Sequence, residues 1–156
     1  MDAENSYQVF DWLWTSGQLS AQDIQALPSL SMDVVINLAL PTSSNALAGE
    51  ADLVTAQGMS YVQIPVQWEQ PKPEQFTQFV GVINAFSQRN IWVHCAKNMR
   101  ASAFIYLYRK LILEEDEQQA SFPMQRIWTP NQTWRAWIDT VCMEQARLTT
   151  ARPTRS

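Results

Sequence analysis

The fold is decided by one stretch of sequence, Ile91-Trp92-Val93-His94-Cys95-Ala96-Lys97-Asn98-Met99-Arg100-Ala101-Ser102. Its first part, Ile91–Val93, is β-branched or aromatic throughout, which favours a short buried strand. Residues 101–108 are apolar on nearly every face, and a helix that is apolar all round is buried in the core. A tight polar loop joins the two. We therefore expect a central strand, a loop and a buried helix in immediate succession.

The loop combines a thiol with an arginine, because Cys95 follows the predicted strand and Arg100 opens the predicted helix. A thiolate that faces a helix N-terminus is stabilised by the helix dipole and by the free backbone N–H groups. The same N–H groups bind anions, and a guanidinium can hold two oxygens of one anion. The sequence therefore predicts Cys95 as a nucleophile beside an oxyanion-binding loop made of Ala96, Lys97, Asn98, Met99 and Arg100.

Three polar residues of this stretch have two interpretations each. His94, the only histidine of the chain, either orients the loop and tunes the thiol or is a core histidine with a backbone partner; beside Cys95 we favour the first. Lys97 either adds positive charge to the anion site or points to solvent. Asn98 is suited to a left-handed backbone conformation, and we favour that structural role.

Composition favours one globular domain over residues 1–156, with loose termini at 1–6 and 149–156. Apolar residues make up 46% and charged residues 17% of the chain, and the net charge is −4 without any basic run, which argues against nucleic-acid binding. Two cysteines are too few for a disulfide scaffold, and a candidate nucleophilic thiol suggests a reducing compartment. Neither a signal peptide nor a membrane span is recognisable, so we expect a soluble, cytoplasmic protein.

Strand-like and helix-like segments alternate along the chain, which predicts an α/β fold with a mainly parallel sheet flanked by helices on both faces. In such sheets ligands bind at the carboxyl ends of the strands, where Cys95 lies. Strands are expected at Phe10–Trp14, Asp33–Ala39, Ser60–Val66 and Ile91–Val93. Helices are expected at 20–27, 45–57, from about 73 to 86, 101–113, 121–128 and from 131 onward.

The pair His94-Cys95 followed by Arg100, after an apolar strand, resembles the signature of the cysteine-dependent protein tyrosine and dual-specificity phosphatases. The chain is similar to a small bacterial branch of that superfamily whose function is unknown, members of which are also seen fused to β-lactamase-like hydrolases. The similarity spans about Leu13 to Ala146 and includes Trp14–Gln18, Val34–Leu38, Tyr61–Val66 and the Cys95 loop.

This resemblance implies a dual-specificity-phosphatase-like fold and a phosphatase that forms a phosphocysteine at Cys95. It implies a phosphorylated substrate, or a phosphate or sulfate anion in the loop, and neither a cofactor nor a metal. Ser102 either donates a hydrogen bond to the Cys95 sulfur, easing breakdown of the intermediate, or satisfies its own backbone. A protein partner is not indicated.

The loop departs from the family pattern, because four residues separate Cys95 from Arg100 where the phosphatases have five, and the usual glycine is absent. A six-residue loop from Cys95 to Arg100 is similar to that of the rhodanese sulfurtransferases. Three functions therefore stay open: a phosphatase with weak turnover, a phosphate-binding regulatory module without turnover, and a sulfurtransferase.

The general acid is the second departure. In the family an aspartate after the preceding strand supplies a proton to the leaving group, a contribution of about 10²–10⁴-fold. The corresponding position here holds Gln67, and Glu69 is the only nearby carboxyl before Glu74. Glu69 is thus either the acid or a solvated loop carboxylate. Between them, Trp68 either stacks on an aromatic substrate or packs against the protein.

Overall fold

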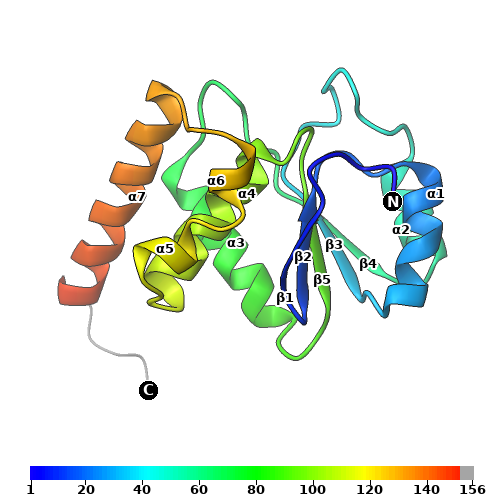
Figure 1. The fold of residues 1–156 in the computed structure, drawn as a ribbon, viewed down its shortest axis with the longest axis horizontal. Coiled ribbons are helices and arrows are strands. Elements are labelled where there is room, and N and C mark those ends of the chain that lie inside the picture. The colour runs from blue at the N-terminus through cyan, green and yellow to red at the C-terminus, as the bar shows by residue number, and fades with distance from the viewer. Residues whose placement is uncertain (152–156) are drawn as a thin grey trace.

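A five-stranded sheet forms the centre of the computed structural model, which describes residues 1–151 and their side chains as far as residue 148 (Figure 1). The strand order is β1-β2-β5-β3-β4, and every neighbouring pair is parallel except β1 with β2. The middle position of β5 confirms the expected central strand. The strands are β1 (Tyr7–Phe10), β2 (Leu13–Ser16), β3 (Val34–Asn37), β4 (Ser60–Gln63) and β5 (Ile91–His94).

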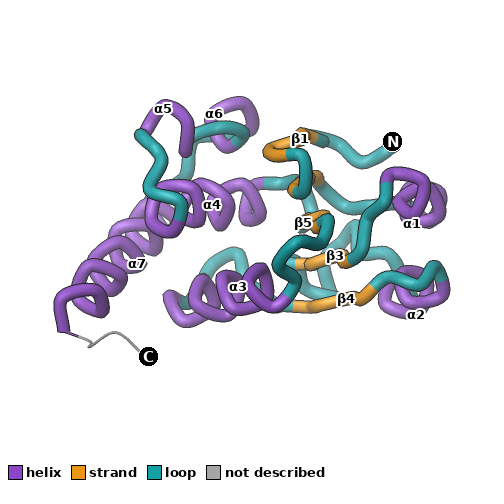
Figure 2. Tube along the Cα trace, turned by 90° about the horizontal axis from the view of Figure 1, so that it is seen from below, coloured by secondary structure: helices purple, strands orange, loops and turns teal. Residues whose placement is uncertain are grey.

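Helices cover both faces of the sheet, as Figures 1 and 2 show, and the α/β fold predicted from the alternating segments is confirmed. One face carries α1 (Ala21–Ala26) and α2 (Glu50–Ala56). The other carries α3 (Pro73–Ala85), α4 (Met99–Leu107), the short helices α5 (Glu117–Ala120) and α6 (Met124–Ile127), and α7 (Gln132–Ala151). A 3₁₀ turn, Leu27–Leu30, follows α1, and α4 continues as a π-helical turn, Tyr108–Ile112.

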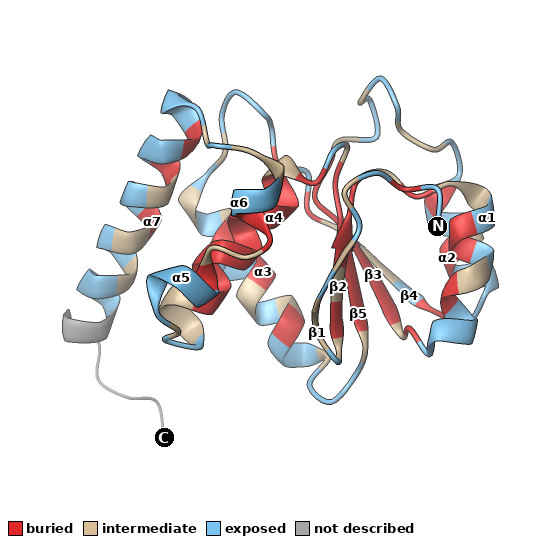
Figure 3. Cartoon of the chain, in the orientation of Figure 1, coloured by how far each residue is buried: buried red, intermediate tan, exposed pale blue. Residues whose placement is uncertain are grey.

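Alternation along the strands divides the core into two clusters, because successive side chains point to opposite faces. Val34 and Ile36 pack with the helices on the α3 and α4 side, whereas Val35 and Trp92 pack with α1 and α2. The helix α4 lies in the larger cluster, and its residues 100–107 are all buried (Figure 3). The largely apolar character of this helix is thus explained by its central place in the fold.

Several segment boundaries differ from the expectations. Residues 10–14 are not one edge strand, because a turn at residues 11–12 makes β1 and β2 a hairpin. The helix expected at 45–57 begins only at Glu50, after Gly49 has taken a left-handed conformation. The segment 121–128 is not one helix: α5 ends before it, and within it only residues 124–127 are helical, in α6. Local polar composition therefore misplaces helix starts where a tertiary contact decides them.

The N-terminal segment is not a loose arm. Ala3 is buried, the Asp2 N–H donates to the Asp23 carboxylate at 2.7 Å, and the Glu4 carbonyl accepts from the Gly17 N–H at 2.8 Å. At the other end, residues 149–151 form the last turn of α7, and residues 152–156 of the expected loose tail lie outside the described part. Within residues 1–151, no helix is both long enough and apolar enough to cross a membrane.

Candidate active site

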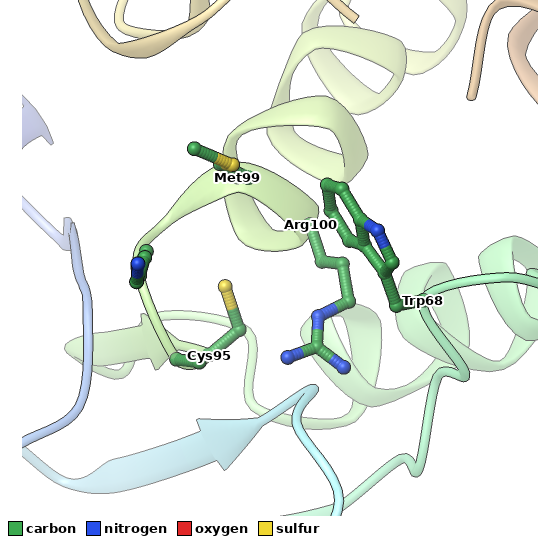
Figure 4. Close-up of a pocket in the computed structure, with 6 residues that line it drawn as sticks. Trp68, Cys95, Met99 and Arg100 are labelled. Carbon is green, nitrogen blue, oxygen red and sulfur yellow. The ribbon is translucent and has the colours of Figure 1, made fainter. Parts of the chain in front are cut away.

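The Cys95 loop lies between the end of β5 and the start of α4, at the carboxyl edge of the sheet. Cys95 is 1% exposed, and its Sγ accepts a hydrogen bond from the N–H of Ala101 at 3.4 Å. The thiol therefore faces the helix N-terminus, as the sequence predicts. It borders a pocket of about 260 Å³ whose lining residues are Trp68, Cys95, Ala96, Lys97, Met99 and Arg100 (Figure 4).

The carbonyl groups of the loop are bound from outside it. The Ala96 carbonyl accepts hydrogen bonds from the Gln18 N–H at 3.0 Å and from Asn45 Nδ2 at 3.1 Å. The Lys97 carbonyl accepts from Asn5 Nδ2 at 3.0 Å. A planar trans peptide directs its N–H away from its C=O. The N–H groups that follow these carbonyls are therefore directed to the inside of the loop, the arrangement that an oxyanion needs.

Asn98 closes the loop in the left-handed conformation, with φ 67° and ψ 14°, which confirms the structural role predicted for it. Its side chain is completely buried. The Oδ1 accepts from the Thr15 hydroxyl at 2.8 Å, and the Nδ2 donates to the Asn5 carbonyl at 2.8 Å. Two segments far away in sequence thus hold the turn that places the first residues of α4.

Gly17 is a supporting residue that the sequence analysis does not identify. A Cβ added there would lie 2.9 Å from the Ala96 carbonyl oxygen, closer than real Cβ contacts. Only glycine lets the chain after β2 approach the loop this closely. The sequence shows only a glycine directly after a strand. That glycine becomes informative once β2 is known to pair with β5, because both strands then end beside the Cys95 loop.

Arg100 connects the loop to the chain after β4. Its side chain is 7% exposed, and its Nη1 donates to the Val66 carbonyl at 2.8 Å. Figure 4 shows the guanidinium beside Cys95 in the same pocket. The structure therefore brings together the predicted nucleophile and the predicted anion-binding arginine. Lys97 is exposed and lines the same pocket, so its charge lies at the rim.

Glu69 is not brought to this site. It is exposed and borders a different pocket, beside Thr133 and Trp137 of α7. The neighbouring Trp68 lines the pocket beside the thiol instead, and the exposure of Glu69 agrees with the alternative of a solvated loop carboxylate. Among the described residues, the lining of the Cys95 pocket contains no carboxyl group.

Trp68 is fixed before any ligand arrives. Its ring centroid lies 5.4 Å from that of Trp128 and 5.7 Å from that of Trp134, and its carbonyl accepts from Trp134 Nε1 at 2.9 Å. The residue as a whole is 37% exposed, and its side chain lines the pocket (Figure 4). The sequence left open whether Trp68 packs against the protein or faces a ligand. In the structure it does both.

His94 is completely buried and has two polar partners. Its Nδ1 lies 3.2 Å from the carbonyl oxygen of Cys95, and its Nε2 lies 2.6 Å from Oε2 of Glu50. Glu50 begins α2 and also accepts from Gln18 Nε2 at 2.5 Å. Sequence analysis missed Glu50 because it comes from another segment, 44 positions before His94.

The Glu50 carboxyl is buried, which by itself raises its pKa. The hydrogen bond and charge of His94, with a further hydrogen bond from Gln18, outweigh burial and hold the pKa of Glu50 below its ordinary value of 4.5. The pKa of Tyr61 is raised to about 12, chiefly by burial and also by the Glu50 charge. Glu50 is thus ionised and Tyr61 is neutral at physiological pH.

The contacts of Ser102 agree with the second interpretation, in which its hydroxyl satisfies the backbone of its own helix. Its hydroxyl donates to the Met99 carbonyl at 2.9 Å and accepts from Trp128 Nε1 at 3.1 Å. The hydroxyl therefore satisfies the first turn of α4 and anchors Trp128, which in turn stacks on Trp68. In the structure its hydrogen-bond partners are these two groups rather than the Cys95 sulfur.

Comparisons with known proteins agree with this architecture. Residues 2–144 match a family model described as DSP-PTPase phosphatase fused to NAD+ kinase, PTP-NADK. A candidate phosphatase (DUF442) from Shewanella putrefaciens CN-32 is 33% identical with a TM-score of 0.82, covering 92% of this chain and 95% of that one. A search of the curated proteins finds no match.

Two more distant structures share the fold. TpbA from P. aeruginosa, solved in complex with pTyr, is 17% identical with a TM-score of 0.73, covering 96% of this chain and 91% of that one. The core catalytic domain of the PP-IP phosphatase SIW14 from S. cerevisiae, solved with citrate, is 12% identical with a TM-score of 0.69, covering 96% and 94%. Identities this low show only that the fold is shared. The family match and the 33% identical structure show family membership as well. This chain therefore belongs to the PTP-NADK family of dual-specificity-type, cysteine-dependent phosphatases.

Proposed function

We propose that the Cys95 pocket hydrolyses phosphomonoesters, with Cys95 as nucleophile, Arg100 and the N–H groups of residues 96–100 as the phosphate-binding loop, and His94 as support. The observation that carries the proposal is the shared pocket of the Cys95 thiol and the Arg100 guanidinium, in a loop whose carbonyls are bound from outside. Nucleophilic catalysis of this kind divides one difficult displacement into two easier ones.

In the first step the Cys95 thiolate attacks phosphorus, so the Sγ–P bond forms and the ester P–O bond breaks. The electron pair of that bond goes to the leaving oxygen, which takes a proton from water. In the second step water attacks phosphorus, the S–P bond breaks, its electron pair returns to Cys95, and inorganic phosphate leaves. Arg100 and the loop N–H groups stabilise the charge that grows on the phosphoryl oxygens in both steps.

Two features support slow turnover. The loop has one residue fewer than the family pattern, so fewer N–H groups surround the anion, and one lost transition-state donor costs about 10²–10³-fold in rate. The pocket lining described above also lacks a carboxyl that would protonate the leaving group. Slow hydrolysis that favours good leaving groups follows from both.

The substrate that best suits this pocket is an aryl phosphate. The fixed ring of Trp68 lies beside the thiol and offers a face for stacking, and Lys97 adds positive charge at the rim. The solved complex of the distant relative TpbA with pTyr is consistent with such a ligand.

The test compares the wild type with Cys95→Ser and Arg100→Ala on para-nitrophenyl phosphate, phosphotyrosine and phosphoserine. Cys142→Ser is the matched control, because Cys142 is half-buried against the core and lies outside the pocket. We expect turnover by the wild type and the control alone, with the aryl substrates faster. Equal rates for wild type and Cys95→Ser on every substrate would refute the proposal; retained binding of inorganic phosphate would then indicate a binding module.

A sulfurtransferase is the second candidate, favoured by the six-residue loop from Cys95 to Arg100. In that reaction the Cys95 thiolate would take the outer sulfur of thiosulfate, forming a persulfide and releasing sulfite, and a thiol acceptor would remove the sulfur. Sulfite release from thiosulfate, lost in Cys95→Ser, together with no phosphate release, would select this candidate over the phosphatase.

A further inference from the structure

We propose that Glu50 holds His94 as a buried imidazolium, and that this ion pair positions the Cys95 loop and favours the thiolate. Glu50 and His94 are then positioning residues, since neither lines the pocket beside the thiol. The inference rests on the proposed function, because it names what prepares the same cysteine for reaction. It concerns a contact between β5 and α2 that lies behind the loop.

The protonation state follows from the two partners of the ring. A backbone carbonyl only accepts hydrogen bonds, so the contact of 3.2 Å between Nδ1 and the Cys95 oxygen requires a proton on Nδ1. The partner of Nε2 is a carboxylate oxygen of Glu50 at 2.6 Å. An ionised carboxylate also only accepts, so Nε2 must carry a proton as well. A ring with both nitrogens protonated is positively charged.

Glu50 is built to remain ionised in this place. Its carboxylate receives hydrogen bonds from Gln18 Nε2 and from His94, and only 6% of the residue is exposed. The other titratable group beside it, Tyr61, is neutral: its hydroxyl accepts from Asn37 Nδ2 at 3.0 Å and donates to Gln63 Oε1 at 3.2 Å. The positive charge that balances Glu50 is therefore that of His94.

The position of this charge matters for the thiol. His94 directly precedes Cys95, and its ring holds the carbonyl of Cys95 on the side away from the pocket. That contact orients the peptide that follows Cys95, whose N–H belongs to the loop. A neutral histidine could satisfy either the carbonyl or an ionised Glu50 as a donor, but not both. A buried ion pair is often no more stabilising than an apolar pair of the same size, whereas removal of one partner is costly. We therefore assign this pair a role in the geometry of the loop.

The first experiment uses the wild type alone. Because His94 is the only histidine of the chain, its ring nitrogens give unambiguous signals in a ¹⁵N NMR spectrum of the labelled protein. We expect both nitrogens to carry a proton at pH 7, since each faces a hydrogen-bond acceptor. A neutral ring, with a single protonated nitrogen at pH 7, would overturn the proposal, and this outcome needs neither turnover nor any variant.

The second experiment removes the charge of Glu50 with Glu50→Gln, which keeps the size and the hydrogen-bonding capacity of the side chain. Asp52→Asn is the matched control, because Asp52 lies in the same first turn of α2 but is exposed. Alkylation of Cys95 by iodoacetamide at pH 7, in a Cys142→Ser background, measures the thiolate. We expect Glu50→Gln to slow it about tenfold, because a smaller fraction of the Cys95 side chains is then ionised, and Asp52→Asn to leave it unchanged.

Equal alkylation rates in folded Glu50→Gln and in the control would refute the role of the charge in favouring the thiolate. If Glu50→Gln does not fold, Gln18→Met takes its place in the alkylation experiment, because it removes one hydrogen-bond donor to the Glu50 carboxylate. The NMR measurement on the wild type needs neither variant and still decides whether His94 is charged. Absence of phosphatase turnover would refute the proposed function, yet both readouts here would remain. The two failures are therefore distinguishable.

Discussion

The Nη1 group of Arg100 donates a hydrogen bond to the backbone carbonyl of Val66 at 2.8 Å. This contact joins the N-terminus of α4 to the chain that leaves β4, and Trp68 lies two residues farther on. The arginine that is proposed to hold the phosphate therefore also sets where the opposite side of the pocket lies.

We predict that Arg100→Lys weakens oxyanion binding by about 10- to 100-fold, because an ammonium cannot hold the Val66 carbonyl and two anion oxygens in one plane. The inhibition constant of orthovanadate measures this. Arg126→Lys serves as the control, since Arg126 is exposed on α6. Equal vanadate inhibition of Arg100→Lys and wild type would mean that Arg100 does not bind the anion.

Gly17→Ala should disturb the loop from outside. The new Cβ would lie 2.9 Å from the Ala96 oxygen and must displace it, an overpacking that costs about 1–3 kcal/mol of unfolding free energy. Vanadate inhibition should weaken in parallel. Gly81→Ala is the matched control: it lies in α3 with no atom within 4 Å of its added Cβ, and should gain about 0.5–1 kcal/mol. Urea unfolding of both variants gives the comparison, and an unchanged Gly17→Ala would contradict the close approach.

The stability of the protein should depend on Glu50 in a defined pH range. Because its pKa is lowered below 4.5 in the folded state, its ionised form stabilises the fold above pH 4.5, and this contribution is lost as the pH falls through the folded value. Glu50→Gln should therefore cost about 3 kcal/mol at pH 7, and the cost should shrink below pH 4.5. Chemical unfolding at pH 7, 5, 4 and 3 measures it, and a cost that is constant with pH would argue against the ion pair.

Leaving groups should control the rate of hydrolysis. Without a carboxyl in the described pocket lining, expulsion of the oxygen is unassisted, so the rate should fall steeply from para-nitrophenyl phosphate to phenyl phosphate and to alkyl phosphates. Glu69→Gln should change none of these rates by more than about twofold, far less than the effect of a true general acid. A selective loss on alkyl phosphates in Glu69→Gln would return Glu69 to the mechanism, through a movement of its segment.

Local sequence is sufficient for the part of the site that is continuous. The strand at 91–94 and the buried helix after it are set by residues that are neighbours in the chain, and the structure agrees. The asparagine at position 98 also indicates a left-handed turn, but Thr15 and Asn5, from other segments, hold that turn in place.

Supporting residues from elsewhere could not be predicted in this way. Gly17 is needed only because the Ala96 carbonyl comes close to it, and Glu50 matters only because α2 begins beside His94. Neither contact leaves a periodic pattern. Glu69 shows the converse case: a carboxyl close in sequence borders a different pocket, while its neighbour Trp68 joins an aromatic cluster with Trp128 and Trp134.

Asn5 makes two hydrogen bonds to the Cys95 loop: its Nδ2 donates to the Lys97 carbonyl, and its own carbonyl accepts from the side-chain Nδ2 of Asn98. The beginning of the chain is thus part of the frame that shapes this loop. Trimming residues 1–6 to obtain a shorter version for crystallisation would remove that frame, and a bulky purification tag placed there would press on it. Recombinant versions are better tagged at the other end, where α7 packs against α3 and α4 and away from the Cys95 loop (Figure 1).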